Sequence, residues 1–212
     1  MSNDALPFLG CRELAVGLTD AVVARLSLTG ELGYEISVRA AEQRALWGAL
    51  VDAGRNFGLK PIGMRAQDSL RLEKGYGVWS LEFTAATTPA MCGLDRYLAF
   101  DKGDFIGRAA ALAERDAGPK QRLVLLAIDA TDADVTGYEP IWSAGRRVGY
   151  VTSGAYGHHL GLSLALAYLD RALADRGANQ PAPLSVHVVG EERAARLLPE
   201  APYDPKGERL RS

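Results

Sequence analysis

The chain has 212 residues, 48% of them hydrophobic and 24% charged, which are ordinary values for a globular protein with a buried core. Its formal net charge of −2, without any lysine- or arginine-rich run, excludes a general nucleic-acid binder. No apolar stretch reaches membrane-spanning length, and the N-terminal residues lack the pattern of a secretory signal. Cys11 and Cys92 lie far apart, which favours a reduced protein, so we expect a cytoplasmic protein without a membrane partner.

The first part of the chain predicts short strands joined by turns. Residues 12 to 16 and 22 to 28 are rich in strand-forming side chains, and residues 17 to 20 supply a turn between them. A third strand is expected at residues 34 to 38, after a turn that contains two glycines. These strands give the first part of the chain its β component.

The third strand carries the most informative acidic residue. Tyr34, Ile36 and Val38 alternate with polar residues, and successive side chains of a strand point to opposite faces. We therefore expect Tyr34, Ile36 and Val38 to pack in a core. Glu35 then points away from that core, toward solvent or a cleft.

Two helices are expected after these strands. Residues 41 to 57 have apolar side chains at helical spacing, and a glycine and a proline follow them. A second helix is expected at residues 64 to 74, ending before a glycine. Arg71 and Glu73 lie near its end, and we interpret them as structural ion-pair partners. The first part of the chain therefore predicts an α+β fold.

The pattern changes after Gly118-Pro119-Lys120, which marks the expected boundary between a domain of residues 1 to 118 and a domain of residues 119 to 212. Beyond it, short apolar runs recur with Gly, Pro, Asp or Asn between them, as in a small antiparallel barrel or sandwich. The runs are residues 122 to 128, 146 to 153, 162 to 169, 184 to 189 and 192 to 198.

Most catalytic signatures are absent from the sequence. His158, His159 and His187 have no Cys, Asp or Glu at metal-ligand spacing, so we expect no metal site. The sequence contains no nucleophile elbow, phosphate-binding loop or dinucleotide fingerprint, which disfavours hydrolases, kinases and dinucleotide-binding enzymes. The glycine-rich run at residues 153 to 161 lies between two expected strands and predicts a turn rather than a phosphate cradle.

Five sequence blocks occur in an order that is typical of one family. They are TGELGYEISV, GMRAQDSLRLEKGYGVW, TTPAMCGLDRYLAFDKGDFIGR, GYVTSGAYGHHLGLSLALAYL and APYDPKGERLR. In this order the chain resembles the glycine-cleavage T-protein (aminomethyltransferase) family. Its sequence motifs most resemble those of the relatives fused to flavin domains, the dimethylglycine and sarcosine dehydrogenases. The resemblance implies a partial folate-binding α+β domain followed by a small antiparallel β-barrel, with the N-terminal part of the family fold absent.

The resemblance also implies a cofactor and the residues that hold it. The family binds tetrahydrofolate, and Glu35 matches the strand glutamate that holds the pterin; a carboxylate suits the ring N–H and exocyclic NH₂ of a pterin edge. Gln67 replaces an arginine common in the family, and Arg65 is the candidate instead, as in the flavin-fused relatives, although an offset of two residues places it on another face of the helix. Trp79 matches an aromatic residue near the pocket. Each of these residues also has an interpretation without ligand binding. Glu35 can be part of an ordinary polar strand face, Arg65 a solvated charge on a helix, and Trp79 a side chain that packs in the core.

Three functions stay open on this evidence. The acidic residue that family enzymes use near the folate nitrogen has no counterpart in this sequence, so we expect no catalytic residue here and leave open whether the chain is an enzyme. In the first, the chain is a tetrahydrofolate-dependent aminomethyltransferase-like protein that is incomplete alone. It would transfer a one-carbon unit from an aminomethyl or methylated glycine donor to tetrahydrofolate. The second is a non-catalytic folate-binding or assembly module, and the third is a small subunit of a multi-chain sarcosine or dimethylglycine oxidoreductase. We expect a partner polypeptide or a homo-oligomer to complete the pocket.

Overall fold

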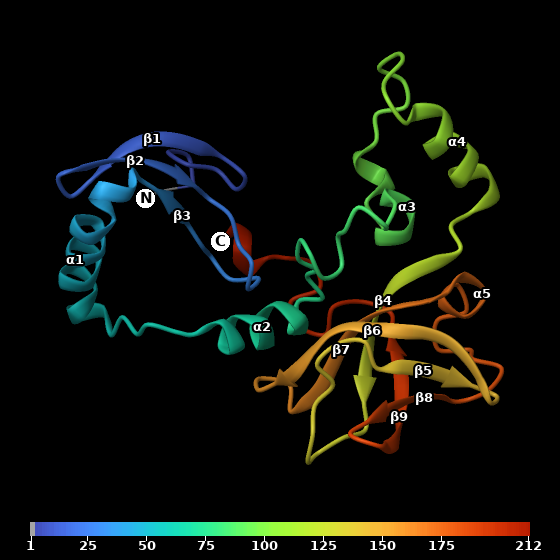
Figure 1. Ribbon diagram of the computed structural model, residues 1–212. Helices are drawn as coiled ribbons and strands as arrows, with labels where there is room; N and C mark the ends of the chain where they lie inside the picture. Colours follow the sequence, from blue (N-terminus) through green and yellow to red (C-terminus); the bar gives the residue numbers. More distant parts are fainter. Residues whose placement is uncertain (1–2) are drawn as a thin grey trace. The chain divides into compact units, whose positions relative to one another are not determined.

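The computed structural model describes residues 3–212 and divides into two compact units (Figure 1). The first unit comprises Met1–Gln67 and Lys206–Ser212, and the second comprises Asp68–Pro205. The last residues of the chain therefore belong with the first. The expected domain boundary between residues 118 and 119 stays a prediction.

The first unit contains a three-stranded antiparallel sheet in the order β1-β2-β3. A two-residue turn joins β1 to β2, and Gly17 adopts a φ of +62° in it. This tight turn makes β2 begin and end earlier than the predicted strand at residues 22 to 28, because the hairpin register fixes where β2 starts. The strands are β1 (Cys11–Val16), β2 (Thr19–Ala24) and β3 (Glu35–Ser37).

One face of this sheet packs in a small core. Ile36 and Val38 lie against a buried cluster formed by Leu6, Ala21 and Val23, which confirms the alternation predicted for residues 36 and 38. Tyr34 is the exception, and its predicted packing is wrong, because β3 begins only at the following residue and the tyrosine side chain is exposed.

The predicted helix at residues 41 to 57 is present as a succession of three short elements. A 3₁₀ turn at Ala40–Glu42 leads into α1 (Gln43–Gly54), and a second 3₁₀ turn at Arg55–Phe57 ends at Gly58, whose φ is +70°. Helix α2 (Met64–Glu73) begins in the first unit and ends in the second. No helix in the described part of the chain is long and apolar enough to cross a membrane.

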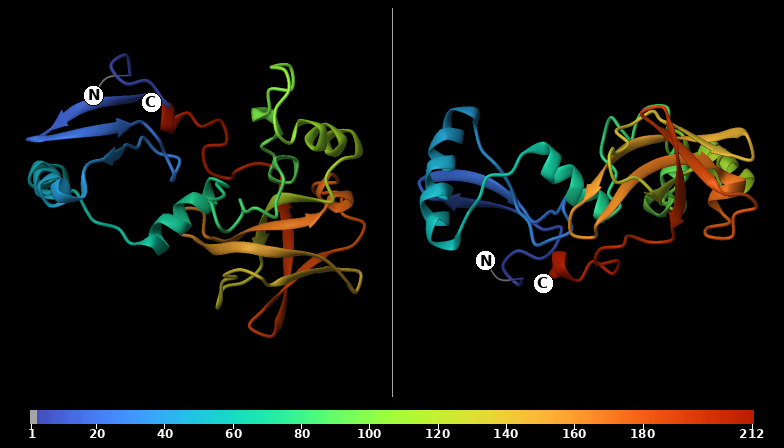
Figure 2. Two further views of the ribbon diagram at one scale, coloured as in Figure 1. Left: turned by 45° about the horizontal axis from the view of Figure 1, so that its top comes forward. Right: turned by 90° about the horizontal axis from the view of Figure 1, so that it is seen from below.

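The second unit is built on a closed antiparallel barrel with the strand order β4-β7-β6-β5-β8-β9, which confirms the predicted barrel (Figure 2). Closure pairs β9 with β4, so the sheet has no free edge. The short strand β5 was not predicted, because it has only four residues and its pairing with β6 contains a register shift. The strands are β4 (Gln121–Ile128), β5 (Pro140–Ser143), β6 (Arg146–Gly157), β7 (Leu162–Asp170), β8 (Leu184–Val188) and β9 (Glu191–Leu198).

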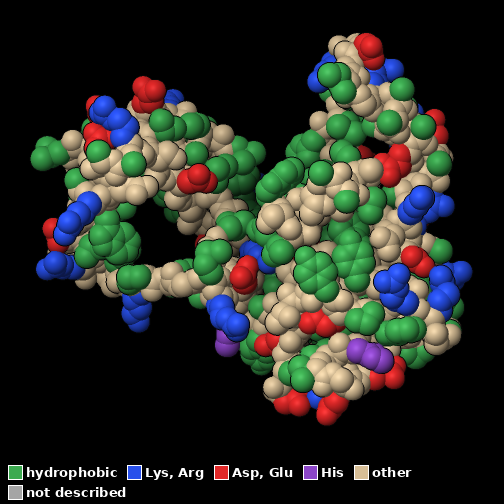
Figure 3. All heavy atoms as spheres, viewed as in Figure 1, with side chains coloured by type: hydrophobic (Ala, Val, Ile, Leu, Met, Phe, Trp, Pro, Cys, Tyr) green, Lys and Arg blue, Asp and Glu red, His purple; other side chains and the backbone are tan. Residues whose placement is uncertain are grey.

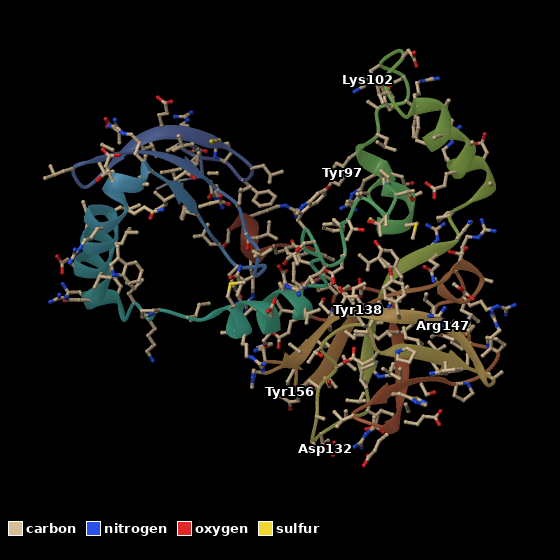
Figure 4. All side chains as sticks on the ribbon, in the orientation of Figure 1. Tyr97, Lys102, Asp132, Tyr138, Arg147 and Tyr156 are labelled. Carbon is tan, nitrogen blue, oxygen red and sulfur yellow. The ribbon has the colours of Figure 1, made fainter. Side chains whose placement is uncertain are left out.

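Three short helices accompany the barrel. They are α3 (Pro89–Cys92), α4 (Arg108–Ala117) and α5 (Arg171–Ala174). Figure 4 shows Tyr97 and Lys102 on the segment between α3 and α4, which extends away from the barrel strands. The side chain of Thr88 caps α3 by accepting a hydrogen bond from the amide of Met91 at 3.2 Å.

Candidate functional site

The face of the first unit's sheet that lies opposite the Leu6 cluster is open. The strand register places Val22 between Glu13 and Ser37, and Ala24 beside Glu35 in the next row. These side chains share a face because they occupy alternate positions on each strand. Glu35 therefore points away from the core, as its position in the sequence predicts, and its side chain is exposed.

A cavity of about 690 Å³ lies on this open face. Glu35 does not line it, but Ser37 does, and residues two apart on a strand are about 7 Å apart. Glu35 thus lies one row beyond the wall of the cavity. The lining residues are Glu13, Leu14, Ala15, Asp20, Ala21, Val22, Ser37, Val38 and Arg39.

The Glu35 carboxylate is free to bind a ligand. No hydrogen bond or ion pair joins it to any other described residue, whereas the nearby Glu42 is paired with Arg39 at 3.2 Å. The backbone of Glu35 is fixed by its pairing with Ala24 in β2. A rigid strand therefore presents a carboxylate whose two oxygens can both accept hydrogen bonds.

Arg65 lies in the first turn of α2, and its side chain is exposed. No hydrogen bond or ion pair joins its guanidinium to another residue in the described range 3–212, and none brings it to Glu35. Gln67 is half-buried. The structure therefore leaves both Glu35 and Arg65 available for a ligand without placing them in contact.

Trp79 belongs to the second unit and does not pack in a core, because its side chain is 76% exposed. It lies on a tight turn in which the amide of Ser80 donates to the carbonyl of Phe83 at 3.0 Å. Ser80 adopts a φ of +74° in this turn, a left-handed conformation that few non-glycine residues adopt. The indole is thus presented to solvent by an ordered turn.

Glu82 holds this turn on the barrel, a role that the sequence analysis missed. The residue is completely buried, and one carboxylate oxygen accepts hydrogen bonds from the hydroxyls of Thr152 and Ser153 on β6, both at 2.6 Å. The other oxygen accepts from the amide of Val78 at 2.9 Å and lies 3.8 Å from the guanidinium of Arg71. The only sequence signal was a glutamate three residues after Trp79, but sequence alone does not show whether such an acid is buried or exposed.

The carbonyl of Glu82 adds a further contact to the same group. It accepts a hydrogen bond from the hydroxyl of Tyr168 at 2.9 Å, and the thiol of Cys92 lies 3.1 Å from that hydroxyl. Burial raises the pKa of Tyr168, and its hydrogen bond with Cys92 raises it further. Tyr168 therefore stays protonated and serves as a structural donor.

The predicted ion pair between Arg71 and Glu73 is wrong, although both side chains are structural. Arg71 is buried and pairs instead with Asp68 at 2.8 Å. One oxygen of the buried Glu73 carboxylate accepts from the amides of His159 and Leu160, at 2.8 and 3.3 Å. Residues two apart on a helix do not face each other, which explains why the pair does not form.

The turn that Glu73 contacts is the predicted glycine-rich hairpin between β6 and β7. Only residues 158–161 of the predicted run form the turn, because residues 153–157 belong to β6. Two backbone amides of the turn bind a carboxylate of the protein itself. Among the described residues, no group of three or more His, Cys, Asp or Glu side chains is close enough to hold a metal ion. The first unit offers exposed binding groups at Glu35 and Arg65, and the second unit separately offers the exposed indole of Trp79.

Comparison with known proteins relates this geometry to one family. Residues 1–102 match the model of the GCVT N-terminal domain, and residues 121–204 match the glycine cleavage T-protein C-terminal barrel domain. The crystal structure of the glycine cleavage system aminomethyltransferase T from Bartonella henselae is similar, with a TM-score of 0.82 and 26% sequence identity. That similarity covers 97% of this chain and 55% of that one.

Curated relatives include the mitochondrial dimethylglycine dehydrogenase of Homo sapiens, 35% identical over 94% of this chain and 23% of its own length. The aminomethyltransferases of Streptomyces avermitilis and Koribacter versatilis are 42% and 37% identical, over 74% and 82% of this chain. The matches span 43% and 48% of those two enzymes, so the chain covers less than half the length of these relatives. Since both family models match in order and together span most of the chain, it belongs to the glycine-cleavage T-protein (aminomethyltransferase) family.

Proposed function

We propose that this chain is the folate-binding and barrel portion of a tetrahydrofolate-dependent aminomethyltransferase-like protein. The observation that carries the proposal is the free carboxylate of Glu35, held by a strand on the open face of the first unit's sheet. The donor of the one-carbon unit is proposed to be an aminomethyl group or a methylated glycine. A similar dimethylglycine dehydrogenase supports the second donor class.

The residues present fit tetrahydrofolate in their chemistry. A pterin edge presents a ring N–H beside an exocyclic NH₂, and the matching acceptor is a carboxylate with both oxygens free. Glu35 meets this requirement, because no other described residue occupies its oxygens. Tetrahydrofolate, when bound, supplies the nitrogen that accepts the one-carbon unit.

A second side chain of the first unit is proposed to hold the cofactor. The free guanidinium of Arg65 can pair with a carboxylate of the glutamate tail of folate, since arginine binds carboxylates through two parallel N–H donors. The role of Arg65 follows from its exposure and from the family match. Trp79 lies on the second unit with an exposed indole, and its binding role stays a prediction from the resemblance.

The transfer step itself needs an acid or base within hydrogen-bond reach of the reacting nitrogen, and this requirement decides how the chain should behave alone. Glu35 is proposed to bind the pterin edge, so it cannot also act as the acid or base at the reacting nitrogen. We therefore expect the purified chain to bind tetrahydrofolate weakly and to transfer no methylene group from an aminomethyl donor.

Isothermal titration calorimetry with tetrahydrofolate under anaerobic, reducing conditions tests this function. The wild-type chain is compared with Glu35→Gln and with Glu13→Gln, a matched control that removes the same charge from the same sheet face. We expect Glu35→Gln to weaken binding about 10-fold or more, because a hydrogen bond to a charged group is worth about 1.5–3 kcal/mol. Glu13→Gln should bind as the wild type does.

Four results contradict the proposal. Absence of binding to the wild type at millimolar tetrahydrofolate removes the folate function. Equal affinity of the wild type and Glu35→Gln removes Glu35 from the site, and equal losses in the two variants show a general charge effect. Turnover by the purified chain alone contradicts the expectation that its catalytic group lies elsewhere.

A further inference from the structure

The loop that leads into Glu35 has almost no core of its own. It comprises residues 25–34, between the end of β2 and the start of β3, and only Arg25 and Gly30 of the loop are buried. Figure 3 shows hydrophobic side chains at the surface of the first unit. A segment with few buried apolar contacts needs other contacts to hold one conformation. The exposed apolar side chains of the loop are Leu26, Leu28, Leu32 and Tyr34.

Arg25 anchors the start of this loop through its backbone. It directly follows Ala24, the residue that pairs with Glu35 in the sheet. The amide of Arg25 donates to the carbonyl of Gly10 at 2.9 Å, and its carbonyl accepts from the amide of Leu9 at 3.1 Å. The end of β2, against which Glu35 pairs, is therefore joined to the segment before β1.

The guanidinium of Arg25 adds contacts from the interior of the first unit. The residue is 1% exposed, and a buried cation is costly unless its donors are hydrogen-bonded. Nη1 donates to the carbonyl of Leu6 at 3.2 Å and to the side-chain oxygen of Asn3, and Nη2 donates to the carbonyl of Ser212 at 2.8 Å. One side chain thus joins three segments that all belong to the first unit.

The two ends of the loop lie close together beside Arg25. A methyl group at Gly33 would lie 2.6 Å from the carbonyl oxygen of Leu26, so the backbone at Gly33 passes directly over the residue that follows Arg25. Glu35 comes two residues after Gly33. A shift of Arg25 would therefore be transmitted through this contact to the start of β3.

Glu35 depends on this anchor because its own strand is short. β3 has three residues, and Glu35 is the first of them. We propose that Arg25 is a positioning residue, which fixes the Glu35 carboxylate for its ligand by tying the end of β2 and the following loop to residues 3–10 and 212. A carboxylate held in its binding geometry before the ligand arrives loses less entropy on binding. The identity of the ligand rests on the proposed function, whereas the ordering of the loop does not.

A double-mutant cycle separates positioning from a general structural role. Arg25→Lys keeps the charge but loses the forked pair of Nη donors. NMR titration with tetrahydrofolate, which measures weak affinities, should show binding about 5-fold or more weaker in Arg25→Lys than in the wild type. In a Glu35→Gln background the same change should alter affinity less than about 2-fold, because no carboxylate is left to position. Arg44→Lys, an exposed change of the same kind on α1, is the control and should bind as the wild type does.

Backbone order measured without folate tests the same residue independently. NMR order parameters of residues 26–35 should fall in Arg25→Lys from about 0.85, typical of rigid backbone, toward about 0.6. Those of β1 and β2 should stay unchanged. Asn3→Ala removes one acceptor of the guanidinium from an exposed residue, and should loosen the same loop to a smaller extent. This second variant protects the test against a folding defect, and thermal melting shows whether each variant keeps its fold.

Three outcomes would overturn the inference. They are equal losses of affinity from Arg25→Lys with and without the Glu35 carboxylate, unchanged order in residues 26–35 of both variants, and an equal loss of order over the whole sheet. Absence of tetrahydrofolate binding to the wild type refutes the proposed function instead. The order parameters then decide alone whether Arg25 positions Glu35.

Discussion

Replacement of Glu82 by glutamine should strongly destabilise the barrel unit. The carboxylate is completely buried and accepts three hydrogen bonds, from the hydroxyls of Thr152 and Ser153 and from the amide of Val78. Glutamine has the same shape but only one acceptor oxygen. If that oxygen faces the hydroxyls, the new NH₂ group opposes the amide of Val78, donor against donor.

The size of the effect follows from these contacts. Hydrogen bonds to charged groups are worth about 1.5–3 kcal/mol each, and Glu82→Gln loses at least one of them in a dry site. The guanidinium of Arg71, which lies 3.8 Å from Glu82 and is 2% exposed, also loses part of its compensating charge. Breaking a buried ion pair by removing one partner typically costs about 3–5 kcal/mol. Because Asp68 still pairs with Arg71 at 2.8 Å, we expect a loss of about 3 kcal/mol.

Urea denaturation measures this loss as a change in the free energy of unfolding. Glu139→Gln is the matched control, because its carboxylate accepts from the amides of Thr136 and Gly137, both at 2.8 Å, in a half-buried position. Solvent can replace a lost partner there, so the control should cost no more than about 1.5 kcal/mol. A cost for Glu82→Gln below about 1 kcal/mol, or no larger than that of the control, refutes the reasoning.

Three further predictions concern stability. Since burial raises the pKa of Tyr168, the unfolded chain loses that proton first. The contribution of Tyr168 to stability should therefore be constant below about pH 9 and fall above about pH 10, by up to about 1.4 kcal/mol per pH unit. Urea titrations at pH 8 to 11 should show a weaker fall in Tyr168→Phe than in the wild type, and an identical fall contradicts the prediction. Gly149→Ala places a methyl group 2.2 Å from the carbonyl oxygen of Tyr168 and should cost about 1–3 kcal/mol, whereas Gly48→Ala, with open space around it in α1, should stabilise by about 0.5–1 kcal/mol; thermal melting that reverses this order contradicts the packing. Trp79→Ala should change stability by less than about 0.5 kcal/mol, because the indole is exposed, and a loss above 1.5 kcal/mol in the same assay would show that it packs.

The parts of the fold that could be predicted are those with a strong local signal. Alternation at residues 36 and 38 gave the buried face of β3, and the apolar runs separated by turn residues gave five of the barrel strands. Strand β5 was not predicted, because four residues with a shifted register carry little periodicity. Tyr34 was misplaced for a related reason, since β3 begins one residue later than the alternation suggests.

The candidate site was harder to predict, because its structural partners are distant in sequence. Local spacing suggested a pair between Arg71 and Glu73, but the fold gives Glu73 the amides of His159 and Leu160, more than 80 residues away. Glu82 likewise depends on Thr152, 70 residues further along the chain. By contrast, the outward direction of Glu35 follows from strand alternation alone, and the structure places it on the open face.

The central claim is that the Glu35 carboxylate accepts the paired donors of a pterin edge, and a ligand lacking one of those donors tests it most directly. Wild type and Glu35→Gln are titrated with tetrahydrofolate and with its analogue in which hydrogen replaces the exocyclic amino group. The wild type should bind the analogue about 10-fold to 150-fold more weakly, which corresponds to one charge-assisted hydrogen bond. Glu35→Gln should discriminate far less between the two ligands. Equal discrimination by both proteins would show that the amino group is bound elsewhere and would contradict the claim.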